Sequence, residues 1–363
     1  MKRTAKRVTM ADVARAAGVS PAVAGRALGG YGYVSDDKRK RVAAAAARLG
    51  YRPDMVARSM VTGRTGTLGI IGADIGNPFF AGAVRGIADV ARQHGFDTLL
   101  TNSDEDVAIE RDALRVLLAK RVDGIIVSPA DVGQSDHLRE AAAQGMPLVM
   151  LDRRVADIEA DAVVIDNIEA SRCAVAHLIA QGHRRIALIT ELATRDDRQL
   201  LDALGGELTP DTARLNTSGA RLCGYLAAHH DAGIKIDPEL VRPTTAYSSA
   251  SARARTEQLL ALAAPPTALF TGDSVMTLGA FEAVQRHNIR IPDELAFLAF
   301  DDMEWMALVR PSLSALRQPV HAMGAAAARL LLGRLERPER PCEQQVFPVE
   351  LRVRDSTRRP VTS

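Results

Sequence analysis

Short apolar runs alternate with amphipathic stretches from residue 66 onward. The runs predict strands, and the stretches between them have the spacing of apolar residues that predicts helices. The predicted strands are TLGIIGAD, FDTLLTN, DGIIVSP, PLVMLD, IALIT, ALFTG and LAFLAF, and the predicted helices cover residues 79–94, 107–120, 134–144, 218–230, 275–287 and 320–335. This alternation indicates an α/β fold whose parallel, doubly wound sheets are covered on both faces.

A crossover near residues 166–167 is expected to divide this region into two lobes. The N-lobe then covers about 66–166 and the C-lobe about 167–300, with further crossovers in 301–363. The stretch QQVFPVELRVRDS is predicted as one final strand. Ligands of such sheets bind beyond the carboxyl ends of the strands, so a ligand is expected in the cleft between the lobes.

The first fifty residues have a different pattern, which predicts three short helices. Thr9 and Asp12 form a capping-box signature for a helix over 10–17, and Gly18 can end it in the left-handed conformation. Ser20 and Pro21 then open a second helix. A third helix over 36–49 follows, with Ser35 as its predicted cap and with an apolar stripe of Val42, Ala45, Ala46 and Leu49. Two helices joined by a short turn with glycine predict a helix-turn-helix.

Such a bundle can be a purely structural module or a DNA-binding domain, and the distribution of charge decides between these two interpretations. Residues 1–64 contain fourteen Lys or Arg and four acids, a net charge of +10, whereas the other 299 residues carry 32 bases and 40 acids. The near-neutral total therefore hides a basic head on an acidic body. A basic head is the electrostatic footprint of a nucleic-acid-binding domain, so DNA binding is the better interpretation.

Several classes of protein are disfavoured by what the chain lacks. No N-terminal signal segment and no apolar run of eighteen residues is found, so we expect a cytoplasmic protein without a membrane partner. The three cysteines, Cys173, Cys223 and Cys342, have no metal-binding spacing. A dinucleotide fingerprint, a P-loop, a nucleophile elbow and HExxH are all missing, which argues against an enzyme and against a cofactor.

Three segments together resemble the head of the lactose-repressor/galactose-repressor (LacI/GalR) family of bacterial transcription regulators. They are VTMADVARAAGVS, VSDDKRKRV and LGYRPDMVARSM, and a looser resemblance continues to about Arg354. The resemblance implies a helix-turn-helix head over 1–52, a hinge helix and linker over 53–65, and an effector domain of periplasmic-binding-protein type over 66–363. It also implies a homodimer that binds a pseudo-palindromic operator in double-stranded DNA, one head per half-site.

In this motif the second helix enters the major groove. Arg26 is the residue on this helix suited to a bidentate contact with guanine, although it could instead contact phosphate or remain solvated. Pro21 and Ala22 depart from the family and offer only apolar contact. The resemblance assigns phosphate contacts to Thr9, Ser20, Tyr33, Ser35 and Tyr51, several of which also suit helix caps.

The hinge segment contains Ala57 and Met60, which the resemblance places at the minor groove. Met60 stands where the family usually has the leucine that wedges between base pairs. Residues 53–64 could instead be a plain linker. The basic arm of residues 1–7 is expected to add affinity without sequence preference.

Polar residues follow many of the predicted strands and are candidates for the ligand cleft, although such residues can equally cap helices. They are Asp74, Asn102, Ser128, Asp152, Asp166, Thr190, Asp273 and Asp301. The resemblance adds Phe79 and Phe80 as stacking faces, Thr217 and Arg221 as ligand contacts, and Trp305 and Gln318 nearby. Phe79 and Trp305 could alternatively belong to the core. The predicted effector site is therefore Phe79, Phe80, Asn102, Asp152, Thr217, Arg221, Asp273, Asp301, Trp305 and Gln318.

Two departures from the family concern this site. Gly272 stands where an asparagine side chain commonly reaches the ligand, and the polar segment 191–215 is longer than its family counterpart, with Leu215 in place of an arginine found in some relatives. The effector could therefore be a sugar, a nucleobase or another polar metabolite. No leucine heptads follow the last predicted strand, which argues for a dimer rather than a tetramer.

The sequence thus predicts a DNA-binding transcriptional regulator, a repressor, controlled by a small polar effector between two lobes. A regulator that senses a protein partner is the alternative, and a sugar- or nucleotide-processing enzyme is the least supported class.

Overall fold

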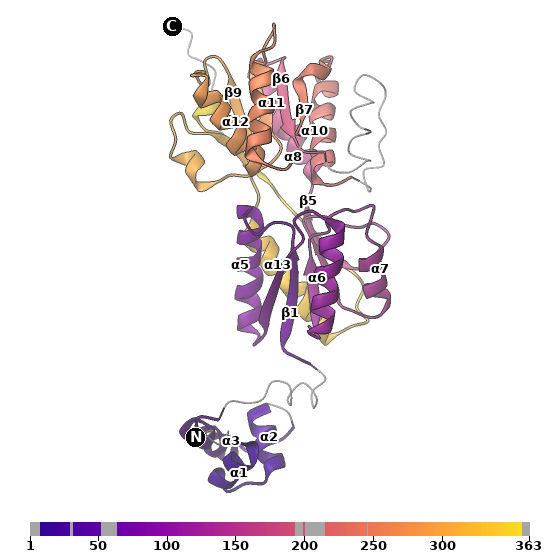
Figure 1. Cartoon of the computed structure of the whole chain (residues 1–363), viewed down its shortest axis with the longest axis vertical. Helices are drawn as coiled ribbons and strands as arrows, with labels where there is room; N and C mark the ends of the chain where they lie inside the picture. The colour runs from indigo at the N-terminus through magenta and orange to yellow at the C-terminus, as the bar shows by residue number, and fades with distance from the viewer. Residues whose placement is uncertain are drawn as a thin grey trace, which may run out of the picture. The chain divides into compact units, whose positions relative to one another are not determined.

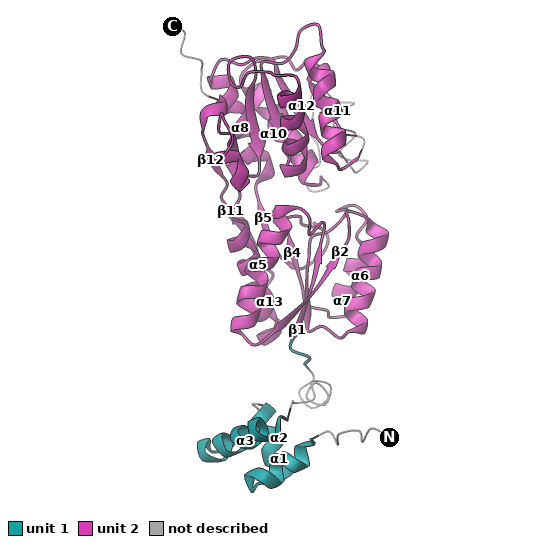
Figure 2. Ribbon diagram, turned by 60° about the vertical axis from the view of Figure 1, so that its left-hand side comes forward, with its two compact units in different colours: residues 1–66 teal, residues 67–363 magenta. Residues whose placement is uncertain are grey.

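The computed structural model describes residues 8–29, 32–51, 64–192, 199, 215–244 and 246–357. The chain forms two compact units, residues 1–66 and 67–363 (Figure 2). Each unit has its own hydrophobic core, so each is described by itself.

The described part of the smaller unit contains α1 (Met10–Ala17), α2 (Pro21–Gly29) and α3 (Asp36–Leu49). The predicted capping box is present, because the Thr9 side chain accepts from the Asp12 amide and the Asp12 carboxylate accepts from the Thr9 amide. Gly18 ends α1 with φ 65°, the left-handed conformation that glycine adopts without a steric penalty. The small core contains Val13, Ala14, Ala17, Ala24, Val42, Ala45 and Ala46.

One predicted cap in this unit differs from expectation. Ser35 stands at the N-cap of α3, but its side chain makes no capping hydrogen bond among the described residues. Asp36 and Asp37 lie in the first turn of α3, where their negative charge favours the amino end of the helix. The start of α3 is therefore supported by charge rather than by the Ser35 hydroxyl.

The N-lobe of the larger unit is built on a six-stranded sheet in the order β11-β5-β4-β3-β1-β2. Its strands, all parallel, are β1 (Thr67–Gly72), β2 (Asp97–Asn102), β3 (Gly124–Val127), β4 (Leu148–Leu151), β5 (Asp161–Ile165) and β11 (Gln344–Phe347). One face is covered by α5 (Pro78–Gln93) and α13 (Val320–Glu336), and the other by α6 (Val107–Ala119) and α7 (Asp136–Ala143) (Figure 1).

The C-lobe repeats this plan in the order β12-β10-β9-β8-β6-β7. Its strands are β6 (Ile186–Thr190), β7 (Val241–Pro243), β8 (Ala268–Thr271), β9 (Ala296–Phe300), β10 (Ser314–Arg317) and the antiparallel β12 (Glu350–Arg352). Helices α8 (Asn167–Ala180) and α10 (Thr217–Asp231) cover one face, and α11 (Ser249–Leu260) and α12 (Ser274–Arg286) cover the other. The described residues of this lobe also form short 3-10 helices over Pro238–Leu240, Glu304–Ala307 and Asp355–Thr357.

The prediction of one final strand over the stretch QQVFPVELRVRDS is wrong. This stretch forms two strands, because β11 joins the N-lobe sheet beside β5 and β12 joins the C-lobe sheet beside β10. Pro348 lies between them and cannot donate to a sheet. Three connections therefore pass between the lobes, at β5–α8, β10–α13 and β11–β12 (Figure 2).

Candidate functional site

The first turn of α2 presents an open surface in the smaller unit. Pro21 and Ala22 are exposed, and the Ser20 hydroxyl accepts a hydrogen bond of 3.3 Å from the Val23 amide. Arg26 is also exposed, and its Nε donates to the Ala22 carbonyl oxygen at 3.4 Å. Ala22 and Arg26 therefore share one side of the helix, as the spacing of four residues predicts.

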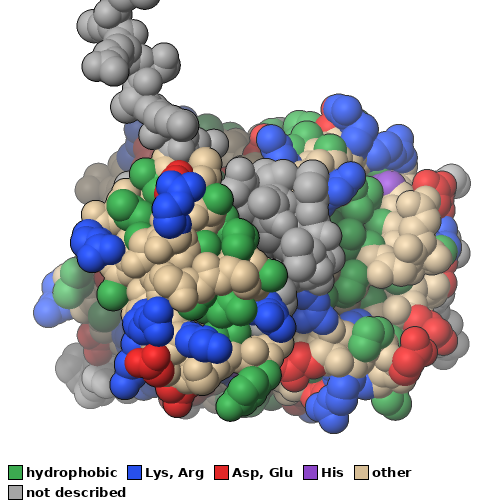
Figure 3. Space-filling model, turned by 90° about the horizontal axis from the view of Figure 1, so that it is seen from below, with side chains coloured by type: hydrophobic (Ala, Val, Ile, Leu, Met, Phe, Trp, Pro, Cys, Tyr) green, Lys and Arg blue, Asp and Glu red, His purple; other side chains and the backbone are tan. Residues whose placement is uncertain are grey.

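The other head residues predicted at DNA are spread over the same unit. Tyr33 is 90% exposed, whereas Tyr51 is half-buried against the head core. Thr9 and Ser20 are exposed and also cap helices, so capping is compatible with the phosphate contacts that were predicted for them. Seen from below, the molecule has Lys and Arg side chains spread over its surface with hydrophobic side chains exposed between them (Figure 3).

Some predictions fall on residues outside the described ranges. Ala57 and Met60, with the rest of the predicted hinge, are among them. The basic arm of residues 1–7 and most of the 191–215 segment also lie there.

Both lobes of the larger unit contribute to a cavity with a volume of about 470 Å³, open solvent included. Eight of the ten predicted effector residues line it: Phe79, Phe80, Asp152, Thr217, Arg221, Asp273, Asp301 and Gln318. Phe79 and Phe80 stand at the amino end of α5 with their rings edge to face, 5.0 Å between centroids. Asp152 and Asp301 directly follow β4 and β9, at the carboxyl ends of the two sheets. The cavity thus has the position expected for a ligand of two doubly wound sheets.

The Arg221 side chain is fixed on three sides. Its Nε donates to the Asn167 side-chain oxygen at 2.8 Å, and its Nη1 donates to the Gly272 carbonyl oxygen at 2.6 Å. The guanidinium carbon lies 3.7 Å from the centroid of the Phe300 ring, which is a cation–π contact. These contacts hold a positive charge in place at the cavity without using the Nη2 group.

Three aspartates of the cavity are more deeply buried than charged side chains usually are, and burial raises the pKa of each. Burial raises the pKa of Asp152 and of Asp273 to about 6, although Arg153 opposes the shift at Asp152 and amide hydrogen bonds oppose it at Asp273. Burial also raises the pKa of Asp301, against the opposing effects of Arg221 and Gln318. The environment therefore disfavours the charged form of all three carboxylates.

Residues that the sequence did not single out complete the cavity. Arg153 lies 9% exposed and forms a two-pronged ion pair with Glu105, in which Nη2 donates to Oε1 at 2.8 Å. Across the cleft, the Asn77 amide nitrogen donates to the Tyr247 hydroxyl at 2.9 Å, which ties the N-lobe to the C-lobe. The Asn77 side-chain oxygen also accepts from the Phe79 amide at 2.9 Å and so caps α5.

Asn102 and Trp305 are not among the residues that line this cavity. The Asn102 side chain instead accepts from the Ile75 amide at 3.0 Å and donates to Asp104 at 2.9 Å, so it holds the loop after β1. Trp305 packs against Phe281 with 5.5 Å between ring centroids, in the hydrophobic core of the C-lobe. For Trp305 the alternative of a core residue is the one that fits its contacts.

The departure at Gly272 has a steric cause. A Cβ at this position would lie 2.7 Å from Thr190 Oγ1 and 3.1 Å from Thr190 Cβ on the neighbouring strand β6. An asparagine therefore does not fit unless Thr190 moves. In its place the Gly272 carbonyl oxygen is used to fix Arg221.

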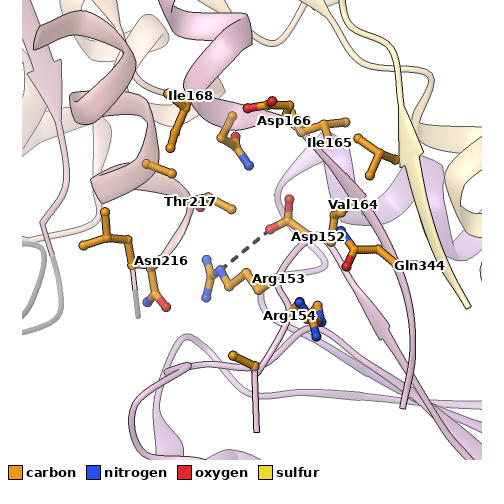
Figure 4. Close-up of a pocket in the computed structure, with 15 residues that line it drawn as sticks. Asp152, Arg153, Arg154, Val164, Ile165, Asp166, Ile168, Asn216, Thr217 and Gln344 are labelled. Carbon is orange, nitrogen blue, oxygen red and sulfur yellow. Dashed lines mark ion pairs between the residues drawn. The ribbon is translucent and has the colours of Figure 1, made fainter. Parts of the chain in front are cut away.

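A second, more open cavity adjoins the first on the side of β5 and β11 and has a volume of about 910 Å³, open solvent included. Asp152, Arg153 and Thr217 belong to both cavities. Figure 4 shows the Asp152 carboxylate and the Arg153 guanidinium facing one another, and their closest atoms are 3.7 Å apart. The two cavities are therefore neighbouring parts of one cleft, with this ion pair at their boundary.

Comparison with known proteins identifies the chain. The profile described as bacterial regulatory proteins, lacI family, matches residues 9–54, and a periplasmic binding protein-like domain matches residues 175–357. The chain is 33% identical over 347 residues to the HTH-type transcriptional regulator RegA of Clostridium saccharobutylicum, covering 95% of this chain and 98% of RegA. The chain belongs to the LacI family. It is also 31% identical over 357 residues to the HTH-type transcriptional repressor CytR of Escherichia coli K12, with 98% of each chain covered.

Solved structures of LacI-family proteins share the fold over nearly the whole chain. The lac repressor dimer bound to operator and the anti-inducer ONPF superposes with a TM-score of 0.80 at 25% identity, covering 97% of this chain and 99% of that one. The complex of the transcriptional regulator CelR with cellobiose gives a TM-score of 0.68 at 27% identity, covering 96% and 100%. This LacI-family chain is accordingly a helix-turn-helix transcriptional regulator and not an enzyme. Within the described residues no helix is long and apolar enough to cross a membrane.

Proposed function

We propose that the protein is a repressor that binds a pseudo-palindromic DNA operator as a homodimer. Its affinity for the operator falls or rises when a small polar effector occupies the cleft between the lobes. The observation that carries this proposal is the cavity lined by buried polar side chains from both lobes at the carboxyl ends of their sheets. Burial of several polar groups around a cavity is costly unless a ligand or water satisfies them. Solved relatives support the assignment, because one holds cellobiose and another, from Enterococcus faecium, holds ribose.

The cleft is also suited to transmit the presence of a ligand. Asn77 of the N-lobe contacts Tyr247 and Ser274 of the C-lobe, at 2.9 and 3.3 Å. On another side, Asn216 of the C-lobe accepts from the Val132 amide at 3.3 Å and donates to the Ala130 carbonyl oxygen at 3.4 Å. A ligand that strengthens or breaks such contacts changes the relative stability of two lobe arrangements, which is what allosteric control requires.

On the DNA side, we propose that Arg26 reads bases while Pro21 and Ala22 make apolar contact in the major groove. Thr9, Ser20, Tyr33, Ser35 and Tyr51 would contact phosphates, and Ala57 and Met60 the minor groove. The exposure of Pro21, Ala22, Arg26 and Tyr33 supports these roles. The lac repressor dimer bound to operator supports the dimeric mode of binding, and a cytoplasmic location follows from a function at DNA.

The test begins with selection of binding sites by the full-length protein from random double-stranded DNA. We expect an enriched site with two inverted half-sites, because a two-fold dimer presents two equivalent heads. A fluorescence anisotropy titration of the selected site is then repeated with candidate effectors. Any effector that changes the DNA affinity must have its own affinity changed by DNA by the same factor. Binding without sequence enrichment would refute the proposal.

A further inference from the structure

Acidic side chains outnumber basic ones in the cleft between the lobes. Among the described residues five carboxylates line it, those of Glu105, Asp152, Glu191, Asp273 and Asp301, against the two guanidinium groups of Arg153 and Arg221. A ligand that enters the cleft therefore meets more acidic than basic side chains.

Arg153 gives its side-chain hydrogen bonds to Glu105 and to two backbone oxygens. Both of its terminal nitrogens donate to the Glu105 carboxylate, and Nη1 also donates to the carbonyl oxygens of Pro129 and Ala130, at 3.0 and 3.3 Å. Its Nε, the atom nearest Asp152 at 3.7 Å, makes no hydrogen bond. The ion pair with Glu105 thus takes the terminal nitrogens of Arg153 and leaves Asp152 with an electrostatic contact but no hydrogen bond from this side chain.

Arg221 is the remaining cation, and it is shared among three carboxylates. Its charge acts on Asp152, Asp273 and Asp301, and in each case burial outweighs it, so that the pKa of each carboxyl stays raised. Two of its nitrogens are already bonded to Asn167 and Gly272. Arg221, together with an Arg153 whose terminal nitrogens are bonded to Glu105, does not balance three buried carboxylates, because each of them loses hydration that a nearby charge must replace.

Acceptor atoms in the cleft also lack donors. The Asp152 side chain is 7% exposed and accepts no hydrogen bond from the described residues. Gln318 is 6% exposed and donates from Nε2 to Asp301 at 2.7 Å, while its Oε1 has no hydrogen-bond partner in the described part of the chain. The orientation of this amide is fixed because only its NH₂ group can face a carboxylate. A buried amide oxygen without a donor is a position where a ligand N–H or O–H is expected.

Two helices, α5 and α12, have their amino ends at the cleft, where free backbone amides could attract an anion. Both ends are already capped by side chains. The Asn77 side chain accepts from the first turn of α5, and Asp273 accepts from the amides of Val275 and Met276 in the first turn of α12, at 2.7 and 2.9 Å. Among the described residues the amino end of α10 has no such side-chain cap, so this helix end and Arg221 favour an anion. Thr217 and Ser218 of that turn also bring hydroxyl groups, which suit neutral parts of a ligand.

We infer that the effector of this cleft carries a protonated amine, held by Asp152 and Asp301 with Gln318 Oε1 as a further acceptor. This inference rests on the proposed effector function of the cleft and adds its charge class. An ammonium group supplies three donors and the positive charge that the three aspartates lack. A neutral polyol supplies donors but no charge, and a phosphorylated or carboxylated ligand adds repulsion from the three aspartates. The rings of Phe79 and Phe80 provide an apolar wall on which the rest of the ligand packs.

The test compares ligands that differ only in charge. Full-length protein is screened by thermal shift and calorimetry at pH 7.5 with two matched sets: glucosamine, glucose and glucuronate, and pentane-1,5-diamine, pentane-1,5-diol and glutarate. We expect the amine of at least one set to bind at least tenfold more tightly than its neutral analogue, and the acids to bind more weakly still. A neutral or acidic member that binds as well as its amine overturns the inference, and so does a screen in which no amine stabilises the protein.

A variant then connects the amine to the cleft. Asp152→Asn should weaken binding of the preferred amine at least tenfold and change binding of the neutral analogue less than threefold. Asp112→Asn, on the exposed surface of α6 and 74% exposed, is the matched control and should change neither. Equal losses for amine and neutral ligand would show a purely structural role of Asp152.

These outcomes separate the inference from the proposed function. If glucose or glucuronate binds and Arg221→Ala abolishes that binding, the cleft is an effector site and only the charge class is wrong. If the selected operator DNA binds but no amine does, the regulator function stands and the inference is rejected. Failure of DNA selection would refute the regulator function whatever the ligand screen shows.

Discussion

Asp152 and Asp301 occupy equivalent positions in the two lobes. Each directly follows the strand that lies third from the β11 or β12 edge of its sheet, β4 or β9. Each also has a left-handed backbone, with φ 71° and 70°. Aspartate and asparagine tolerate this conformation better than most residues with a side chain. The two-lobed repeat thus brings two buried carboxylates to one cleft from opposite sides, each at a turn that restricts which residues can replace it.

Replacement of Asp152 by asparagine should stabilise the free protein above pH 6. Burial raises the pKa of Asp152 to about 6 from its ordinary value of 3.8, so the folded state binds more protons than the unfolded state between these values. The stability linked to this group is therefore present below about pH 4 and is lost as pH rises through about 6. At pH 7.5 we expect Asp152→Asn to raise the free energy of unfolding by roughly 2 kcal/mol.

Urea denaturation of the larger unit at pH 4.5 and pH 7.5 measures this effect. The difference between wild type and Asp152→Asn should appear at pH 7.5 and shrink at pH 4.5, whereas Asp112→Asn should match wild type at both. A pH-independent difference would show that the pKa of Asp152 is not shifted in the folded protein. Asparagine is the right replacement, because it keeps the tolerance for positive φ that alanine lacks.

Gly272→Asn, which restores the residue common in the family, should destabilise the C-lobe. The new Cβ would lie 2.7 Å from Thr190 Oγ1, and overpacking of this kind costs about 1–3 kcal/mol. The second variant Gly272→Asn/Thr190→Ala removes that oxygen and should recover part of the loss. Thermal unfolding measures both, and a double variant no more stable than the single one would rule out Thr190 as the obstacle.

Tyr247→Phe should loosen the contact between the lobes without disturbing either lobe. The substitution removes the hydroxyl that accepts from Asn77 at 2.9 Å, a hydrogen bond with a net contribution of about 0.5–1.5 kcal/mol. We expect effector affinity to fall several-fold and the radius of gyration by small-angle X-ray scattering to increase. Ser251→Ala on the same lobe serves as a control. Unchanged affinity and unchanged size would show that this contact does not influence closure of the cleft.

The sequence predicted the elements that have strong hydrophobic periodicity. It missed β5, α8, β7, α11 and β10, for different reasons. Strand β7 has only three residues and ends in a proline, and α11 has the sequence SASARARTEQLL, in which only Ala252, Thr256 and Leu259 are buried. A pattern with so few buried positions resembles a solvated loop, and only packing against α12 and the sheet makes it a helix.

The residues of the cleft likewise divide into those that the sequence could predict and those that it could not. Those at strand ends, such as Asp152 and Asp301, could be predicted, because the carboxyl ends of parallel strands mark the ligand side. The roles of Glu105 and Tyr247 could not, since they depend on contacts with Arg153 and Asn77 across 48 and 170 residues of sequence. Trp305 and Asn102 met the sequence criteria equally well, and only their contacts show that one packs in the core and the other holds a loop.

Arg26→Ala should remove sequence discrimination more than DNA binding itself. The side chain lies along α2, with Nε 3.4 Å from the Ala22 carbonyl oxygen, a weak contact that is given up at little cost when the guanidinium turns to a guanine edge. A bidentate contact of that kind contributes about 1–3 kcal/mol of discrimination, so the ratio of operator to scrambled-DNA affinity should fall roughly tenfold or more. Arg48→Ala on the exposed side of α3 removes the same charge and should weaken both affinities alike. Fluorescence anisotropy at two salt concentrations measures both ratios. If Arg26→Ala behaves like Arg48→Ala, with the ratio preserved, then Arg26 contacts phosphate and the bases are read by other residues of the head.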